Sequence, residues 1–307
     1  MKEKDVLVTG GAGFLGHHLC RKLDNVGYGV KVFDLRPNEE FKTTIGDLRE
    51  KGSLELKEAL RGVGAVIHLA GFIEAGESVQ DPRKYVENNI LGSFNLLEAM
   101  RETDVKKIIF SSSAAVYGEP TQVPIPESAP TYPVNTYGST KAAVEVLMSS
   151  YAYNYGFSAI ALRYFNLYGP GENHNPETHL IPRFIYMMKN NMDLTVWGDG
   201  QHKREYVYVE DIATAHILAL GLNKGFEAIN LSSGRGNSVQ EVIYLISDIL
   251  QTKPKIKYLD PRPGDPKILQ ADTQKAKKLL GWEAETKLED GLKTTVDYFN
   301  GRDVNLG

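Results

Sequence analysis

Two short runs of residues have the types and spacing that acid–base chemistry needs. Residues 111–118 read SSSAAVYG, and residues 137–141 read YGSTK after a proline-rich loop. Tyr137 and Lys141 are four apart at the predicted start of a helix, so their side chains lie on one face, one turn from each other. A tyrosine hydroxyl titrates at about pH 10 in water. To act as a base near neutral pH, Tyr137 therefore needs nearby positive charge, which Lys141 supplies.

The serine run ends an apolar stretch that predicts a buried parallel strand. It therefore lies at the carboxyl edge of the predicted sheet, where ligands bind in open α/β folds. A Tyr-x-x-x-Lys pair by itself is common and has no functional meaning. Because this strand end and an upstream glycine turn precede it, the pair predicts a catalytic site.

The glycine turn follows the first apolar run. Residues 9–16 read TGGAGFLG, which satisfies G-x-G-x-x-G with Gly11, Gly13 and Gly16, and G-x-x-G-x-x-G with Gly10 as the first glycine. Glycines allow a tight turn and a close backbone approach, so a diphosphate can sit on the amino end of the following helix. The alternative, a purely structural turn, is disfavoured because the motif follows a predicted strand and opens a predicted helix.

An acid at the end of the second predicted strand indicates the cofactor. Asp34 stands eighteen positions after Gly16, where a carboxylate accepts hydrogen bonds from the adenosine ribose hydroxyls of NAD. Its charge disfavours the 2′-phosphate of NADP, although the nearby cation Arg36 makes the distinction less sharp. Asp47, in the run GDL at 46–48, is a candidate for a contact near the adenine. The alternative for Asp47 is an ordinary turn aspartate.

Strand-like apolar runs alternate with segments of helical period. The strand-like runs are 6–10, 30–33, 65–70, 107–112 and 159–165, and the predicted helices include 14–27, 81–103 and about 137–155. This alternation predicts an α/β fold with a Rossmann-type, doubly wound parallel sheet that helices cover on both faces.

The alternation stops after Arg163, where a loop rich in glycine, proline and asparagine begins. A strand and a helix within 203–233 then predict a return to the sheet, with Asp211 as a candidate helix cap. We therefore expect an NAD-binding Rossmann domain that comprises 1–166 and about 203–233. A smaller, discontinuous α/β substrate lobe would comprise about 167–202 and 234–307.

Composition and charge exclude several other classes of protein. The chain has 307 residues, 42% of them hydrophobic, and a formal net charge of -4 without a run of Lys or Arg longer than two. It therefore lacks the basic surface of a nucleic-acid or membrane binder. A single cysteine, Cys20, and the lack of a signal-peptide core or a long apolar window predict a cytoplasmic protein. No His, Cys, Asp or Glu cluster has metal-site spacing, so no metal is expected.

These motifs together resemble the short-chain dehydrogenase/reductase superfamily, specifically its extended branch of NAD-dependent sugar-nucleotide epimerases and dehydratases. The match runs nearly end to end. It includes VTGGAGFLG (8–16), HLAG (68–71), FSSSAAVYG (110–118), YGSTK (137–141), RYFNLYGPG (163–171), WGDGQHKREYVYVEDIA (197–213), NLSSG (230–234) and RPGDP (262–266). Within the branch, the run AGESVQDPRKYVENNILGSFNLLEAM (75–100) is most similar to the UDP-glucose 4-epimerase subgroup.

The resemblance implies a role for each matched residue. Tyr137 would be the catalytic base, Lys141 the residue that tunes its pKa and binds ribose, and Ser113 the hydroxyl that hydrogen-bonds the reacting sugar oxygen. The implied cofactor-binding residues are Gly10, Gly13, Phe14, Leu15, Gly16, Asp34, Asp47, Leu48, Leu69, Ala70, Asn89, Tyr137, Lys141 and Tyr164. The implied substrate-binding residues are Ser113, Asn166, His179, Leu180, Arg204, Arg262 and Asp265, the arginines and Asp265 lying around the nucleotide and its diphosphate.

Two positions depart from the pattern of 4-epimerases. Ala115 stands where a threonine is frequent, so one hydroxyl near the sugar is missing, and Ile73 stands where many relatives have a lysine. If that lysine contacts cofactor phosphates, cofactor retention would be looser in this chain. The related dehydratases place a carboxylate pair after the strand-end hydroxyl, where this chain has Ala114 and Ala115, which argues against dehydration.

The resemblance implies an NAD-dependent nucleotide-sugar epimerase, foremost one that interconverts UDP-glucose and UDP-galactose or their N-acetyl forms through a transient 4-keto sugar. A dehydratase or ketosugar reductase of the same family is the alternative, and a non-catalytic NAD-binding regulator a remote one. Relatives commonly dimerise through a bundle of two long helices per subunit, so a homodimer through 81–103 and 137–155 is expected.

Overall fold

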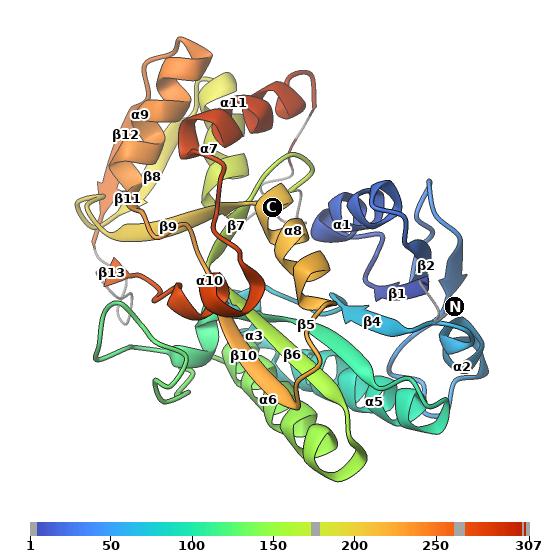
Figure 1. Ribbon diagram of the computed structural model, residues 1–307. Helices are drawn as coiled ribbons and strands as arrows, with labels where there is room; N and C mark the ends of the chain where they lie inside the picture. Colours follow the sequence, from blue (N-terminus) through green and yellow to red (C-terminus); the bar gives the residue numbers. More distant parts are fainter. Residues whose placement is uncertain (1–4, 173–178, 261–267, 303, 305–307) are drawn as a thin grey trace.

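The computed structural model describes residues 5–172, 179–260, 268–302 and 304, and its largest element is a seven-stranded parallel sheet (Figure 1). The strand order is β10-β6-β5-β4-β1-β2-β3. The strands are β1 (Asp5–Thr9), β2 (Gly29–Asp34), β3 (Thr43–Ile45), β4 (Ala65–His68), β5 (Lys107–Ser113), β6 (Ser158–Tyr164) and β10 (Phe226–Leu231). The predicted fold class, a doubly wound parallel sheet, is confirmed.

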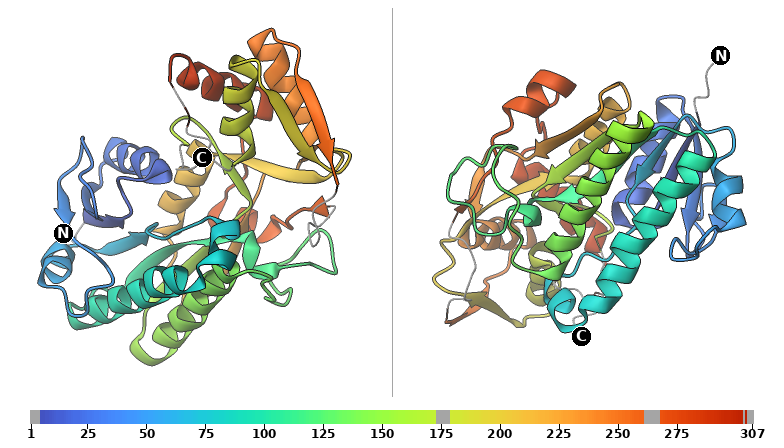
Figure 2. Two further views of the ribbon diagram at one scale, coloured as in Figure 1. Left: turned by 180° about the vertical axis from the view of Figure 1, so that it is seen from behind. Right: turned by 90° about the horizontal axis from the view of Figure 1, so that it is seen from below.

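Helices cover both faces of this sheet, and side chains along each strand alternate between the two layers. In β1, Val6 and Val8 join one buried cluster while Leu7 joins the other. This alternation follows from the two-residue period of a strand. The first cluster is covered by α1 (Phe14–Asn25), α8 (Val209–Ala219) and α10 (Gln274–Leu280). The second is covered by α2 (Leu54–Leu60), α5 (Gly92–Glu102) and α6 (Thr136–Tyr155), and Figure 2 shows α5 and α6 side by side.

The predicted helix 81–103 forms over nearly its whole length, but its middle is not α-helical. The chain passes from α3 (Ala75–Gln80) through α4 (Pro82–Tyr85) into a π-helical stretch, Val86–Leu91, and then into α5. Asp81 begins α4 by accepting a hydrogen bond from the backbone N–H of Lys84. Such π-helical stretches are frequent at functional sites. Here the stretch contains Asn89, a candidate cofactor residue.

A second lobe is built on its own core. A small sheet contains β7 (Asn166–Tyr168), β9 (Lys203–Tyr208), β11 (Gly236–Ser238) and β13 (Ile268–Leu269), and β8 (Asp193–Trp197) pairs with β12 (Lys255–Leu259). The helices of this lobe are α7 (Leu180–Lys189), α9 (Val239–Leu250) and α11 (Leu288–Phe299). Their apolar faces pack into one buried cluster with β8 and β9. Figure 1 shows this lobe above the helix layer formed by α1 and α8.

The chain crosses between the lobes more than once. After β9, which pairs with β7, β11 and β13, α8 packs on α1 and β10 extends the central sheet. The proposed cap of α8 is wrong: Tyr208 is the N-cap residue, and Asp211 instead accepts hydrogen bonds from the backbone N–H and hydroxyl of Thr286. Asp211 lies one turn too far along the helix for capping and anchors the chain before α11. Among the described residues, none of the helices has the length and apolar character to cross a membrane.

Candidate active site

Ser113 and Tyr137 meet at the carboxyl edge of the central sheet. Ser113 is the last residue of β5, and Tyr137 is the second residue of α6. Asn135 caps α6 by accepting a hydrogen bond from the backbone N–H of Gly138 at 2.8 Å. The backbone N–H of Tyr137 donates to the hydroxyl of Ser78 at 3.0 Å. These contacts fix the first turn of α6, so that the side chains of Tyr137 and Ser113 form a hydrogen bond.

Lys141 lies one turn further along α6 and is buried. Its ammonium group donates to the carbonyl oxygen of Ser111 at 2.7 Å and lies 4.8 Å from the centre of the Phe110 ring. The same nitrogen is 5.8 Å from the centre of the Tyr137 ring. The helix spacing of Tyr137 and Lys141 therefore does place both groups on the side of α6 that faces the end of β5.

Burial shifts the pKa values of both Tyr137 and Lys141 away from their ordinary values. Burial raises the pKa of Tyr137, and the Glu74 carboxylate raises it further, whereas the hydrogen bond with Ser113 lowers it. Burial lowers the pKa of Lys141 to about 8, against the opposing effect of Glu145. The hydrogen bond with Ser113 therefore favours the tyrosinate. Lys141, with a pKa of about 8, still carries its proton near neutral pH, and its role in tuning Tyr137 stays a prediction.

Two carboxylates that were not identified from the sequence, Glu74 and Glu172, meet the candidate substrate residue His179. His179 contacts the buried Glu172 through Nδ1 at 2.6 Å and lies 3.5 Å from Glu74 through Nε2. Burial raises the pKa of Glu172, while its hydrogen bond with His179 lowers it. Glu74 and Glu172 come from different lobes, so no sequence spacing indicated that they would converge near Tyr137.

The glycine turn has a shape that only glycine permits. Gly10 has φ 74°, and a Cβ on it would lie 2.6 Å from the backbone nitrogen of Ala70. A Cβ on Gly16 would lie 2.5 Å from the carbonyl oxygen of Gly10. Gly13 is the N-cap residue of α1 and no side chain caps the helix, which has no acid in its first turn. The amino end of α1 therefore has backbone N–H groups that could bind an anion, such as the diphosphate of a dinucleotide.

The acid and the cation at the end of β2 both hold the glycine turn. Asp34 accepts hydrogen bonds from the backbone N–H of Ala12 at 3.0 Å and of Arg36 at 3.2 Å. The Arg36 guanidinium donates to the carbonyl oxygen of Ala12 at 2.9 Å. Asp34 therefore lies beside the glycine turn, as its spacing from Gly16 predicts. The nearby cation, Arg36, is bonded to the same turn.

The other candidate cofactor residues surround the same sheet edge. Asp47 forms an ion pair with Arg49 at 2.6 Å, and the Arg49 guanidinium lowers its pKa. Leu48 packs under Gly92, where a Cβ would lie 3.2 Å from the Leu48 Cβ. Leu69 and Ala70 follow β4, and the backbone N–H of Leu69 donates to the carbonyl oxygen of Thr9.

Asn89 and Tyr164 complete this set, and both make contacts within the protein. The Asn89 amide donates to the carbonyl oxygen of Phe72 at 3.0 Å and to the Thr140 hydroxyl at 3.1 Å, and it accepts from the backbone N–H of Phe72 at 2.8 Å. Asn89 thereby ties the segment after β4 to α6. Tyr164, paired with Ser113 in the sheet, forms a short hydrogen bond with the Ser111 hydroxyl.

Apart from Ser113, the candidate substrate residues that the structure describes lie in the second lobe. The Asn166 amide donates to the carbonyl oxygen of Glu205 at 3.1 Å, next to Arg204 on β9. His179 is the N-cap residue of α7, and Leu180 is the first residue of that helix. Arg204 pairs with Leu269 of β13 and donates to the carbonyl oxygen of Lys203. Arg262 and Asp265 lie outside the described residues.

The chain matches known proteins over most of its length. The model of the NAD dependent epimerase/dehydratase family matches residues 6–232. The chain is 39% identical to the UDP-glucose 4-epimerase of Halalkalibacterium halodurans, covering 95% of this chain and 93% of the relative. The structure of UDP-glucose 4-epimerase from Thermotoga maritima with UDP-glucose superposes with a TM-score of 0.91 at 35% identity, covering 97% of this chain and 99% of that one. The Brucella ovis UDP-glucose 4-epimerase structure with NAD gives 0.91 at 37% identity, covering 96% and 98%.

Proposed function

Because the chain belongs to the NAD dependent epimerase/dehydratase family, we propose that it interconverts UDP-glucose and UDP-galactose, or their N-acetyl forms, by epimerisation at C4. The observation that carries this proposal is the hydrogen-bonded pair of Ser113 and Tyr137, with Lys141 one turn away at the sheet edge. The relatives named above match along both lobes, so the resemblance includes the substrate side as well as the cofactor side.

The residues around the glycine turn fit NAD. A side chain at Gly10 or Gly16 would collide with backbone atoms of Ala70 or of the turn itself, and Asp34 lies beside this turn. Gly10, Gly13, Phe14, Leu15 and Gly16 would hold the diphosphate, and Asp34 the adenosine ribose. The remaining cofactor residues would be Asp47, Leu48, Leu69, Ala70, Asn89, Tyr137, Lys141 and Tyr164. When bound, NAD supplies the group that accepts and returns a hydride at the sugar C4.

The side chains of this chain would handle the proton and hold the sugar. Tyr137, as the phenolate, removes the proton of the sugar 4-hydroxyl and later returns it. Ser113 hydrogen-bonds the same sugar oxygen and favours ionisation of Tyr137. Lys141 would bind the ribose as a cation, and because its pKa is lowered to about 8 it would lose this charge at mildly alkaline pH. The 4-keto sugar must turn over between the two transfers, which requires a roomy sugar pocket.

The nucleotide diphosphate would stay fixed while the sugar turns. Arg204 and Arg262 offer paired donors to phosphate oxygens, and Asp265 belongs to the same nucleotide region. Asn166, His179 and Leu180 would complete the substrate side. In this scheme 1–166 and about 203–233 form the NAD-binding domain, although β9 at the start of the second segment pairs with strands of the other lobe, and about 167–202 and 234–307 bind the nucleotide sugar. Ala114 and Ala115 leave no carboxylate pair after Ser113, which disfavours the dehydratase alternative.

A homodimer in the cytoplasm is the form we propose. Apolar side chains are exposed along the π-helical stretch, α5 and α6: Val86 is 44%, Leu91 44%, Phe94 40% and Val146 70% exposed. The two helices lie side by side on the outer face of the sheet (Figure 2). A second copy that packed the same two helices against them would cover these side chains as a four-helix bundle.

Proton NMR of the purified protein with UDP-galactose, UDP-glucose and their N-acetyl counterparts tests the proposal, first without and then with added NAD. We expect the galacto and gluco forms to interconvert, and Tyr137→Phe to lower the rate by about 10²- to 10⁴-fold because the general base is lost. Ser139→Ala, an exposed hydroxyl on the same helix, is the matched control. No conversion of any of these sugars by protein with bound NAD would refute the assignment.

A further inference from the structure

His68 is a buried histidine at the end of β4, and both of its ring nitrogens have a partner. The Nδ1 atom lies 2.7 Å from the hydroxyl oxygen of Thr9, and the Nε2 atom lies 2.8 Å from that of Ser93. Thr9 is the last residue of β1, directly before Gly10 of the glycine turn, and Ser93 is in the first turn of α5. One ring therefore connects the strand that leads into the glycine turn with the helix layer that covers it.

The direction of each hydrogen bond follows from the groups involved. Burial, and then the Lys141 ammonium, lowers the pKa of His68 to about 3, so the ring is neutral and has a single N–H. The Ser93 hydroxyl donates its proton to the carbonyl oxygen of Asn89, which only accepts. Ser93 must therefore accept from Nε2, and the Thr9 hydroxyl donates to Nδ1. Hydrogen bonds thus run in series from Thr9 through His68 and Ser93 to Asn89.

The Asn89 side chain continues this series to α6. Its amide donates to the Thr140 hydroxyl at 3.1 Å, and Thr140 donates to the backbone carbonyl oxygen of Tyr137 at 2.7 Å. The Asn89 side-chain oxygen accepts from the backbone N–H of Phe72 at 2.8 Å. We call the connected side chains the His68 network, and each of its residues is at most 4% exposed: Thr9, His68, Asn89, Ser93 and Thr140. Because the network is buried, water would not replace a partner that is lost.

The face of the His68 ring makes a second connection to α6. The ring is stacked on that of Phe110 in β5, with ring centres 5.5 Å apart and an angle of 30° between the planes. The Lys141 ammonium lies 4.8 Å from the centre of the same Phe110 ring, where the ring attracts a cation. His68 thus supports the ring that Lys141 contacts, in addition to the hydrogen bonds that lead to Tyr137.

We propose that His68 is a positioning residue, which holds the Asn89 side chain and the Phe110 ring and thereby fixes Tyr137 and Lys141 relative to the end of β1. The catalytic consequence rests on the proposed function, whereas the contacts can be measured without substrate. A break between Thr9 and Asn89 should loosen the Asn89 side chain. The chemical step should then slow, while the nucleotide sugar still binds.

Amide hydrogen exchange, followed by NMR on the purified protein without added ligand, measures how firmly Asn89 is held. The backbone N–H of Phe72 bonds the Asn89 side chain. The backbone N–H of Ala159 in β6 bonds the carbonyl oxygen of Gly225 and is the reference for opening of the whole domain. Thr9→Val keeps the side-chain shape but leaves Nδ1 without its donor, so we expect Phe72 to exchange about tenfold faster relative to Ala159. Thr9→Ser keeps the hydroxyl and should restore the wild-type ratio.

Ser93→Ala breaks the same series one step nearer to Asn89. It should raise the relative exchange rate of Phe72 by a similar factor. In the Ser93→Ala background, Thr9→Val should add less than about a twofold change, because both residues act on Asn89 through one path. Two effects that multiply would contradict the series. Replacing His68 itself would leave two hydroxyls unpaired, so these flanking variants decide even if His68→Ala does not fold.

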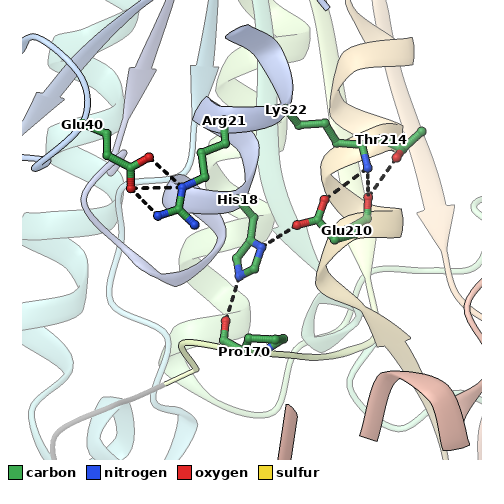
Figure 3. A network of polar contacts seen from close by, with 7 residues as sticks. All are labelled: His18, Arg21, Lys22, Glu40, Pro170, Glu210 and Thr214. Carbon is green, nitrogen blue, oxygen red and sulfur yellow. Dashed lines mark hydrogen bonds and ion pairs between the residues drawn. The ribbon is translucent and has the colours of Figure 1, made fainter. Parts of the chain in front are cut away.

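Thr214→Val is the matched control, on the opposite face of the sheet. Another polar network lies there, in which His18 of α1 contacts Glu210 and the carbonyl oxygen of Pro170 (Figure 3). The Thr214 hydroxyl donates to the carbonyl oxygen of Glu210 at 2.9 Å. This variant removes a threonine hydroxyl from α8, so it should keep the wild-type exchange ratio and the wild-type kcat.

Steady-state kinetics with UDP-glucose at saturating NAD separates the chemical step from binding. We expect kcat to fall about tenfold in Thr9→Val and Ser93→Ala with KM within about twofold of the wild type, and Thr9→Ser to restore kcat. An unchanged Phe72 exchange ratio in both variants, a faster ratio without a fall in kcat, or a change in KM alone would overturn the proposal.

The two measurements separate this role from the proposed function. If no UDP sugar is epimerised, the proposed function fails, and the exchange ratios alone decide whether His68 holds Asn89. If epimerisation is found but Phe72 exchanges in Thr9→Val and Ser93→Ala as it does in Thr214→Val, the function stands and the role of His68 fails.

Discussion

At the scale of single residues, the site is a set of short polar contacts at one sheet edge. Ser113 bonds Tyr137, and Lys141 bonds the carbonyl oxygen of Ser111. Glu74 acts in the opposite sense to Ser113, because its charge raises the pKa of Tyr137. The ionisation of Tyr137 thus depends on a balance between a hydroxyl from β5 and a carboxylate from the segment after β4.

Replacing Ser113 by alanine should change both the rate and its pH dependence. The hydrogen bond from Ser113 lowers the pKa of Tyr137, so its loss raises that pKa and reduces the fraction of phenolate at a given pH. The rising limb of the rate against pH should therefore move to higher pH. We expect kcat to fall about 10- to 100-fold near neutral pH, from the loss of a hydrogen bond to a charged group.

Steady-state kinetics over a pH series measures this effect, with Ser139→Ala as the comparison. Ser139 is an exposed serine on α6 whose hydroxyl donates a hydrogen bond to the carbonyl oxygen of Asn135. A Ser113→Ala enzyme whose pH profile coincides with that of Ser139→Ala would show that Ser113 does not tune Tyr137.

At the scale of elements, the turn between β1 and α1 is the most constrained piece of the cofactor side. The Gly13 backbone N–H bonds the carbonyl oxygen of Gly10, and Gly10 in turn bonds the carbonyl oxygen of Phe33 in β2. Asp34 and Arg36 hold the peptide groups of Ala12 from outside. The helix therefore begins at a fixed place relative to both strands, which a bound diphosphate requires.

Gly16→Ala should disrupt this turn. The added Cβ would meet the Gly10 oxygen at 2.5 Å and the Gly11 backbone at 2.7 Å, closer than real Cβ atoms approach, and backbone atoms cannot rotate away. We expect a loss of about 1–3 kcal/mol in unfolding free energy and at least a roughly tenfold weaker affinity for NAD. Gly225→Ala, which has open space around its Cβ, is the control.

Urea unfolding and calorimetric titration with NAD give the two quantities for both variants. Equal NAD affinity in Gly16→Ala and Gly225→Ala would mean that the close packing of the turn is unrelated to cofactor binding.

At the scale of the whole molecule, two cores are joined by a chain that crosses between them. The central sheet has its own buried clusters on its two faces, and α7, α9 and α11 enclose a separate one. Tyr208 packs against both the first cluster and the third, so the lobes are in direct contact. On the opposite side of the sheet, α5 and α6 are left with exposed apolar side chains. That face is the surface we propose for the dimer.

Val146→Glu should convert the proposed dimer into a monomer. Val146 is 70% exposed at the middle of α6, where burying an unpaired carboxylate between two copies would be costly. Leu54→Glu, at an apolar residue of α2 that is 76% exposed, lies away from the α5–α6 face and is the control. Sedimentation velocity measures the mass of each. A dimeric Val146→Glu, or a monomeric wild type, would rule out this interface.

The sequence by itself predicted the fold class, which the structure confirms, and it singled out the glycine turn and the set of Ser113, Tyr137 and Lys141, whose roles stay predictions. These features are local: strand and helix periods, glycine spacing and a one-turn separation on a helix are set by neighbours along the chain. All five strand-like runs named from the sequence formed strands within two residues of their expected bounds. The position of Asp34 at the end of β2 followed in the same way from its distance to Gly16.

The tertiary structure alone decided the contacts between distant segments. Glu74, Glu172 and His179 come together near Tyr137, and His18 meets Glu210 and Pro170, although up to 192 residues separate these partners. Such contacts depend on how separate elements pack, within one lobe or between the two, and no local spacing encodes that. Burial also lowers the pKa of Lys141 to about 8, which its spacing from Tyr137 along the sequence did not indicate. The electrostatic environment of a side chain is a property of the folded molecule, since the surrounding dielectric and charges exist only once the lobes have packed.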